Sequence, residues 1–219
     1  MATQHLNLDD QEQLDDLKHF WKKWGTIITA VTTVAALSFA GWTGWNFWQT
    51  GLEQKSAVRF DEMTRAVATG DIPKTDRVFA DMKEQFGATS YTAQAALLDA
   101  RMNYEKGNVD ATKAALQWLV DSSAEAAYRD VARLRLGGVL IEAKQYDEAI
   151  KLLNSSMSKS FTALAADRIG DAYILQNKTE EAKAQYQKAY AGLPATDEYR
   201  KMIDVKLARL GVTVKDAAP

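Results

Sequence analysis

Residues 170–194 read GDAYILQNKTEEAKAQYQKAYAGLP, two runs separated by the turn signal Gln176-Asn177-Lys178. Neither run alternates as a strand does, and Ala, the residue with the highest helix propensity, occurs in both and recurs along the second. Small side chains let two helix backbones approach closely, while rings or Leu fill the space left between them. The stretch therefore predicts a helical hairpin. Its pattern comprises Gly170, Tyr173, Ala182, Tyr186, Ala189 and Pro194.

The same pattern recurs upstream at intervals of 33, 37 and 37 residues, and it weakens toward the N-terminus. A fixed period of this size is the signature of a helical solenoid, and the spacings coincide with those of the tetratricopeptide repeat. Further turn signals stand at Thr69-Gly70-Asp71, Lys106-Gly107-Asn108 and Lys144-Gln145. The matching positions are Gly137, Leu140, Ala149, Leu153 and Ser156, then Ala100, Asn103, Thr112, Leu116 and Leu119, and finally Met63, Ala66, Thr75, Phe79 and Met82.

Residues 196–210, TDEYRKMIDVKLARL, predict a final amphipathic helix that covers the open end of the repeats. A terminal repeat needs such a cap because its outer apolar face has no neighbour. Thr196 or Asp197 is suited to the N-cap, and Gly211 predicts the end of the helix. The covering face comprises Tyr199, Met202, Ile203, Leu207 and Leu210.

No charged residue lies between Lys23 and Glu53. Residues 25–48 read GTIITAVTTVAALSFAGWTGWNFW, and as a helix they measure roughly 36 Å, enough to cross a hydrocarbon core of about 30 Å. Aromatic clusters flank the run, as expected at two headgroup levels. A transmembrane helix is predicted. A signal peptide cleaved near Ser38-Phe39-Ala40 is the alternative, opposed by the apolar residues that continue beyond it and by the acidic tail before it. The aromatic residues are Phe20, Trp21, Trp24, Trp42, Trp45, Phe47 and Trp48.

The basic residues near this helix predict its orientation. Lys18, Lys22 and Lys23 lie close to its N-terminal end, whereas Lys55 is the first basic residue after it. Positive charge favours the cytoplasmic side, so the large C-terminal part is expected to be translocated. The predicted fold is all-α. It comprises a cytoplasmic N-terminal tail (1–23), a single transmembrane helix (24–48) and a tetratricopeptide-like helical-repeat solenoid with a C-terminal capping helix (49–219).

The overall composition excludes several classes of function. The chain has 219 residues, 27 Lys+Arg against 29 Asp+Glu and a formal net charge of −2, which argues against a nucleic-acid-binding protein. It has no Cys, and both His residues, His5 and His19, precede the apolar run. The repeat domain therefore lacks the thiol and imidazole groups of common catalytic and metal sites, and no phosphate-binding Gly motif occurs. We expect no catalytic residues, no cofactor and no metal.

One pair of carboxylates remains to be considered as catalytic. Asp167 and Asp171 lie four residues apart on one helix face, and a ligand-shaped pocket around them would favour an enzyme. A solvated or partner-facing surface is the usual setting of such a pair, so the sequence favours a binding module.

Two candidate binding surfaces follow from the helical registers. The first helices of the repeats are expected to line a concave face that binds protein, although the Leu and Ile side chains could instead pack between repeats. In the apolar helix, small residues four apart favour helix–helix association. The concave-face residues are Gln94, Leu97, Arg101, Tyr104, Val131, Leu134, Ile141, Leu164, Asp167, Asp171 and Ile174. The membrane-helix residues are Thr29, Thr33, Ala36, Ala40 and Gly44.

The sequence resembles the YfgM-like ancillary SecYEG translocon subunits of Gram-negative bacteria. The resemblance rests on residues 12–25, EQLDDLKHFWKKWG, on the ending GWNFW at residues 44–48, and on the repeats. It implies a non-enzymatic inner-membrane protein with a periplasmic repeat domain. Such a protein would bind the SecYEG translocon and a membrane-anchored periplasmic chaperone, and help hand over unfolded secretory polypeptides. An envelope scaffold or assembly factor with other protein partners is the alternative.

Overall fold

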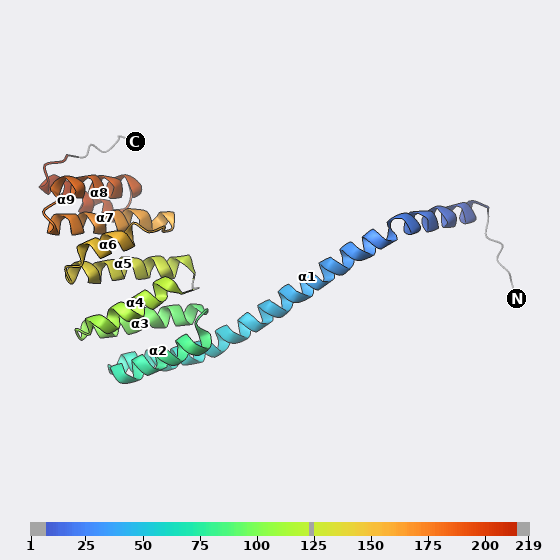
Figure 1. Cartoon of the computed structure of the whole chain (residues 1–219), viewed down its shortest axis with the longest axis horizontal. Coiled ribbons are helices and arrows are strands. Elements are labelled where there is room, and N and C mark those ends of the chain that lie inside the picture. Colours follow the sequence, from blue (N-terminus) through green and yellow to red (C-terminus); the bar gives the residue numbers. More distant parts are fainter. Residues whose placement is uncertain (1–7, 123–124, 214–219) are drawn as a thin grey trace. The chain divides into compact units, whose positions relative to one another are not determined.

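The computed structural model describes residues 8–122 and 125–213, and every regular element within these ranges is an α-helix (Figure 1). The chain forms two compact units, Met1–Gly51 and Leu52–Pro219, which are considered separately. The predicted all-α fold is confirmed. The helices are α1 (Leu8–Thr69), α2 (Ile72–Phe86), α3 (Ser90–Glu105), α4 (Val109–Asp121), α5 (Ala126–Glu142), α6 (Tyr146–Leu153), α7 (Lys159–Leu175), α8 (Thr179–Gly192) and α9 (Glu198–Arg209).

Helix α1 contains 62 residues and contributes to both units. It does not end at residue 48, where the apolar run stops, but continues to Thr69. Its last part, from Leu52, is the first helix of the repeat unit. There Phe60 packs against Tyr91 of α3 with the ring centroids 5.4 Å apart, and Glu53 Oε1 accepts a hydrogen bond of 3.1 Å from the backbone N–H of Ser90.

Four tight turns connect the paired helices of the repeats, and all four lie at the predicted turn signals. Each contains one residue with a left-handed backbone, with φ between 60° and 77°. The same backbone hydrogen bond, 2.8–3.0 Å long, closes each turn by returning to a carbonyl near the helix end. The same type of turn therefore connects the two helices of each repeat. The left-handed residues are Gly70, Gly107, Lys144 and Asn177.

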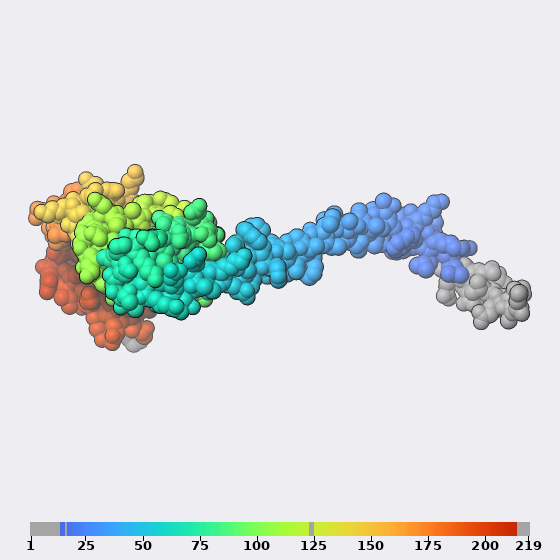
Figure 2. All heavy atoms as spheres, turned by 90° about the horizontal axis from the view of Figure 1, so that it is seen from below, coloured from blue at the N-terminus to red at the C-terminus, as the bar shows by residue number. Residues whose placement is uncertain are grey.

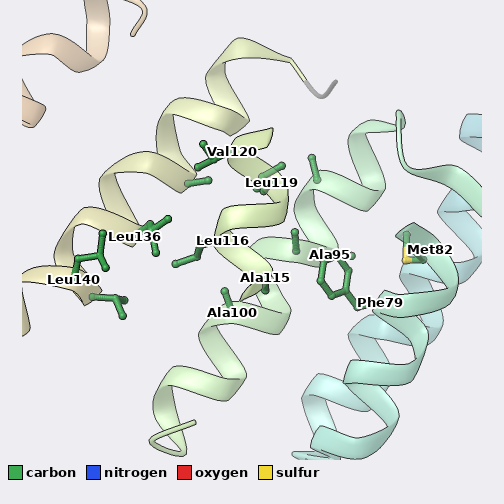
Figure 3. Packing of buried hydrophobic residues seen from close by; sticks show 14 of the residues in the cluster. Phe79, Met82, Ala95, Ala100, Ala115, Leu116, Leu119, Val120, Leu136 and Leu140 are labelled. Carbon is green, nitrogen blue, oxygen red and sulfur yellow. The ribbon is translucent and has the colours of Figure 1, made fainter. Parts of the chain in front are cut away.

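The core of the repeat unit lies between successive helices rather than at one centre. Helix α4 packs on both α3 and α5, so Leu116 lies near Ala100 of α3 and Leu136 of α5 (Figure 3). The repeat pattern marks the closest approaches, because a Cβ on Gly170 would lie 2.5 Å from Tyr186, its partner in the pattern. The predicted role of the small residues is confirmed.

Two positions of the pattern, Ser156 and Pro194, lie outside a helix, and Pro194 lies just after the C-cap of α8, as a helix-terminating residue does. Ser156 matches Ala189 of α8 in the pattern, but α6 is only eight residues long and ends at Leu153. Ser156 is therefore exposed in the loop that follows. The pattern is broken here because Asn154 and the serines after it end the helix before the repeat register is complete.

Helix α9 covers the last repeat, as predicted. Asp197 is its N-cap and accepts a hydrogen bond of 2.9 Å from the backbone N–H of Tyr199. Ile203 and Leu207 are completely buried against α7 and α8. Met202 was expected on the same face, but it is 54 % exposed because it lies one position away from the buried stripe.

Candidate functional site

Among the described residues, no other helix covers the apolar run of α1. From Leu17 onward α1 is the one helix of the described residues that is long and apolar enough to cross a membrane. Figure 2 shows the side chains of this blue segment standing out from a single helix, and Leu37, Phe39 and Phe47 are each more than 65 % exposed. An exposed apolar surface of this extent needs an apolar environment. The helix is therefore a candidate transmembrane segment.

The predicted small-residue stripe lies on the exposed surface of this helix. The Thr hydroxyls are satisfied by the helix itself: Thr29 Oγ1 donates to the carbonyl of Gly25, and Thr33 Oγ1 donates to that of Thr29, both at 2.7 Å. A Cβ at Gly44 would meet no atom within 4 Å. The stripe is thus smooth and free of unsatisfied polar groups, as close helix packing in lipid requires. It consists of Thr29, Thr33, Ala36, Ala40 and Gly44.

The repeat unit carries a groove of about 450 Å³ where α3, α4, α5 and α7 meet. Its floor includes the buried side chains of Ala100, Leu116 and Val139. Thr112 is also buried and Gly138 is half-buried, and the other lining residues are exposed and polar or charged. Tyr104 Oη donates a hydrogen bond of 2.7 Å to Glu142, and this acceptor raises the pKa of the tyrosine hydroxyl. The remaining lining residues are Arg101, Arg135 and Arg168.

Of the predicted concave-face residues, Arg101 and Tyr104 line this groove and are exposed. Several apolar residues of the set are half-buried between helices, which is the alternative that the sequence left open. Ile141 is buried in the core. The half-buried members are Gln94, Leu97, Val131, Leu134, Leu164, Asp171 and Ile174.

Asp167 and Asp171 are held by the capping helix. Lys206 Nζ of α9 lies 2.7 Å from Asp167 Oδ1 and 2.6 Å from Asp171 Oδ1. Tyr199 donates to Asp167 at 2.7 Å, and Tyr186 donates to Asp171 at 2.8 Å. Burial and these acceptors raise the pKa of both tyrosine hydroxyls above the usual range. The pair of carboxylates therefore binds α9 to the last repeat instead of facing an open ligand pocket.

Two arginines of the groove lining, Arg135 and Arg168, escaped the sequence interpretation although the sequence carries a signal for them. They stand 33 residues apart, at one repeat position of α5 and α7, and Arg101, which was predicted, lies on α3 about one turn further along its helix. Gly138 and Glu142, one turn apart on α5, also line the groove. Within the described residues, no group of three or more His, Cys, Asp and Glu is placed to hold a metal ion.

Comparisons with known proteins agree with this architecture. The model of a tetratricopeptide repeat-like domain matches residues 18–212. Crystal structures of nearly identical TPR-like repeats from Podosopora anserina superpose with TM-scores of 0.55 and 0.51, at 15 % identity, over 72 % of this chain and 85 % or 86 % of theirs. At this identity the superposition supports the fold alone.

Curated relatives align over most of the chain, including the residues of the apolar run and of the repeats. The ancillary SecYEG translocon subunit of Neisseria gonorrhoeae is 26 % identical over 205 residues, or 93 % of this chain and 98 % of the relative. Those of Haemophilus influenzae (27 %, covering 84 % and 89 %) and Escherichia coli (23 %, covering 93 % and 98 %) are similar. The chain therefore belongs to the tetratricopeptide repeat-like domain family and is a homologue of the ancillary SecYEG translocon subunits.

Proposed function

We propose that this protein is a non-enzymatic, membrane-tethered adaptor of the SecYEG translocon. The observation that carries the proposal is the extent of the similarity: relatives named ancillary SecYEG translocon subunits align over 93 % of the chain, across the apolar helix as well as the repeats. A helical-repeat unit with an exposed groove is suited to binding polypeptide.

In this proposal the chain is a single-pass protein of the bacterial inner membrane. Residues 1–23 are cytoplasmic, residues 24–48 span the membrane, and residues 49–219 form the periplasmic domain. Lys18, Lys22 and Lys23 support this orientation through the positive-inside rule. A reporter enzyme that functions only in the periplasm should be active when it is fused after Pro219. A reporter enzyme that functions only in the cytoplasm should be inactive at the same position. A reporter active only in the cytoplasm would contradict the topology.

The apolar helix would provide the contact with the channel. The stripe from Thr29 to Gly44 presents small, internally satisfied side chains on which another transmembrane helix can pack closely. The repeat unit would then hold a membrane-anchored periplasmic chaperone and pass emerging, unfolded secretory polypeptides to it. No nucleic acid has a part in this function.

Affinity purification from gently solubilised membranes tests the proposal. A tagged chain should recover the SecYEG subunits together with a membrane-anchored periplasmic chaperone. A matched chain in which residues 24–48 are replaced by an unrelated membrane anchor should recover much less of the channel. Recovery of a different envelope complex in place of SecYEG would support the alternative function, an envelope scaffold or assembly factor, and would overturn the proposal.

A further inference from the structure

One side-chain type recurs along the groove of the repeat unit. Arg135 and Arg168 occupy the same repeat position on α5 and α7, and Arg101 lies on α3 about one helical turn further along, so the groove presents guanidinium groups from three successive repeats. Its one acidic lining residue, Glu142, already accepts a hydrogen bond from Tyr104. The groove therefore has an excess of positive charge in a chain whose formal net charge is −2.

Two of these guanidinium groups are available to a ligand. Arg101 Nε donates to Glu105 at 2.7 Å, whereas Arg135 and Arg168 are exposed and make no hydrogen bond or ion pair within the described residues. Arg168 extends over α5, where its Nη1 would lie 3.6 Å from a Cβ on Gly138. The absent side chain at Gly138 thus leaves room for this guanidinium above the helix.

The floor beneath these groups is apolar. Ala100, Leu116 and Val139 form it, and Tyr104, which is 45 % exposed, lies at its edge. Guanidinium groups bind carboxylates by paired, charge-assisted hydrogen bonds, and an apolar floor favours an aliphatic side chain. The lining therefore combines recognition of negative charge with a place for an apolar anchor.

We propose that this groove binds an extended, acidic segment of a partner polypeptide. Carboxylates of the segment contact Arg135 and Arg168, and an aliphatic side chain lies on the floor. The axes of packed helices are about 9 Å apart. A polyproline-II segment rises about 9 Å over three residues, so acidic residues at every third position have the spacing of Arg135 and Arg168 on neighbouring helices. This inference rests on the proposed function in that it names the chemistry of the polypeptide that the repeat unit receives.

Fluorescence anisotropy with labelled peptides tests this inference on the full chain in detergent micelles. The probe is a peptide of about twelve residues built from Glu-Pro-Leu repeats, which favours the polyproline-II conformation. Its comparison peptides carry Gln or Lys in place of Glu. We expect the acidic peptide to bind about tenfold more tightly than the Gln peptide, and the binding to weaken with added salt.

Two double variants of equal charge separate the groove from general electrostatics. Arg135→Gln with Arg168→Gln should weaken binding of the acidic peptide about tenfold or more and leave the Gln peptide unaffected. The control, Arg77→Gln with Arg209→Gln, removes two exposed arginines outside the groove and should change the affinity by less than about twofold. Gly138→Leu, which fills the space under Arg168, should weaken binding of both peptides.

Equal affinity for the Glu and Gln peptides would overturn the inference, as would an equal loss in the groove and control variants. The recovery of SecYEG by the tagged chain is a separate measurement. A chain that recovers no channel subunit refutes the proposed function whatever the peptides do. A chain that recovers the channel but does not distinguish the peptides refutes the acidic-segment inference alone.

Discussion

The ring of Tyr186 lies directly against the backbone of Gly170, so that a Cβ on Gly170 would be 2.5 Å from Cε1 of the ring. One repeat earlier, a Cβ on Gly137 would likewise be 2.8 Å from the side chain of Leu153. Tyr186 and Leu153 are both 3 % exposed, so neither has space to move away. The two pairs fix the distance between the helices of the last two repeats.

Adding one methyl group at these glycines is expected to destabilise the repeats. Gly137→Ala and Gly170→Ala should each lower the free energy of unfolding by about 1–3 kcal/mol, because overpacking exceeds the gain in helix propensity. Gly138→Ala is the matched control: its Cβ would meet Arg168 at an ordinary 3.6 Å, so it should leave stability unchanged or raise it by up to about 1 kcal/mol. Urea unfolding followed by circular dichroism measures all three. Equal effects at Gly137 and Gly138 would contradict the packing explanation.

The capping helix is expected to depend on Lys206. Lys206→Met removes the cation from Asp167, whose side chain is only 2 % exposed, and leaves a buried carboxylate without its charge partner. The cost should be about 3 kcal/mol, seen as faster amide hydrogen exchange in α9. Lys201→Met, an exposed change on the same helix, should have little effect. Adding Asp167→Asn to Lys206→Met should restore part of the lost protection, and a failure to do so would exclude the buried charge as the cause.

Asp99 is expected to make the stability of the repeat unit depend on pH. Burial, followed by the hydrogen bond and the negative charge of Asp76, raises its pKa to about 7, against a smaller opposing effect of Lys83. The folded state then holds a proton that the unfolded state releases near pH 4. The stabilisation is complete below that pH and is lost as the pH rises through 7.

Urea midpoints at pH 5 and pH 8 measure this effect. The free energy of unfolding should fall by about 2 kcal/mol between them, and Asp99→Asn should remove most of the fall, because Asn keeps a donor toward Asp76 and carries no charge. Asp110→Asn, an exposed change at the start of α4, is the control and should keep the pH dependence. An unchanged pH dependence in Asp99→Asn would contradict the assignment.

Asp130 is expected to anchor the start of the next repeat. Its Oδ2 accepts hydrogen bonds from the hydroxyl (2.5 Å) and the backbone N–H (2.8 Å) of Ser158, the N-cap of α7, and Arg133 pairs with its Oδ1 at 2.7 Å. Burial alone would raise the pKa of Asp130, but these partners outweigh it and lower the pKa. Its stabilising effect is therefore present at neutral pH and lost as acid protonates the carboxylate.

Removal of this carboxylate should destabilise the junction between α5 and α7. Asp130→Ala is expected to cost about 2–3 kcal/mol at pH 7 and much less at pH 3, as measured by urea unfolding. Ser160→Ala, an exposed position in the first turn of α7, should be neutral. The same loss at both pH values would show that the charge is not what holds the junction.

The sequence predicted the local features of the fold well, because turns and close packing depend on a few residue types at fixed spacing. The turns at Gly107 and Asn177 and the packing at Gly170 are of this kind. The sequence could not show which helix faces are buried. Asp167 and Ile141 lie on the same predicted face as exposed residues, and they are buried only because other helices pack on them. The sequence interpretation missed Arg135 and Arg168 although they occupy the same repeat position. An exposed charged residue does not show that it lines a groove until the packing of the neighbouring helices is known.

The proposed association of this chain with the SecYEG channel through its apolar helix can be tested most directly by photo-crosslinking in intact membranes. A photoreactive amino acid is placed at Ala40, on the small-residue stripe, and in a second chain at Ser38, on the opposite side of the helix. We expect a crosslink from position 40 to a channel subunit and a much weaker one from position 38. The absence of any channel crosslink at position 40, with the protein present in the membrane, would contradict the proposed association.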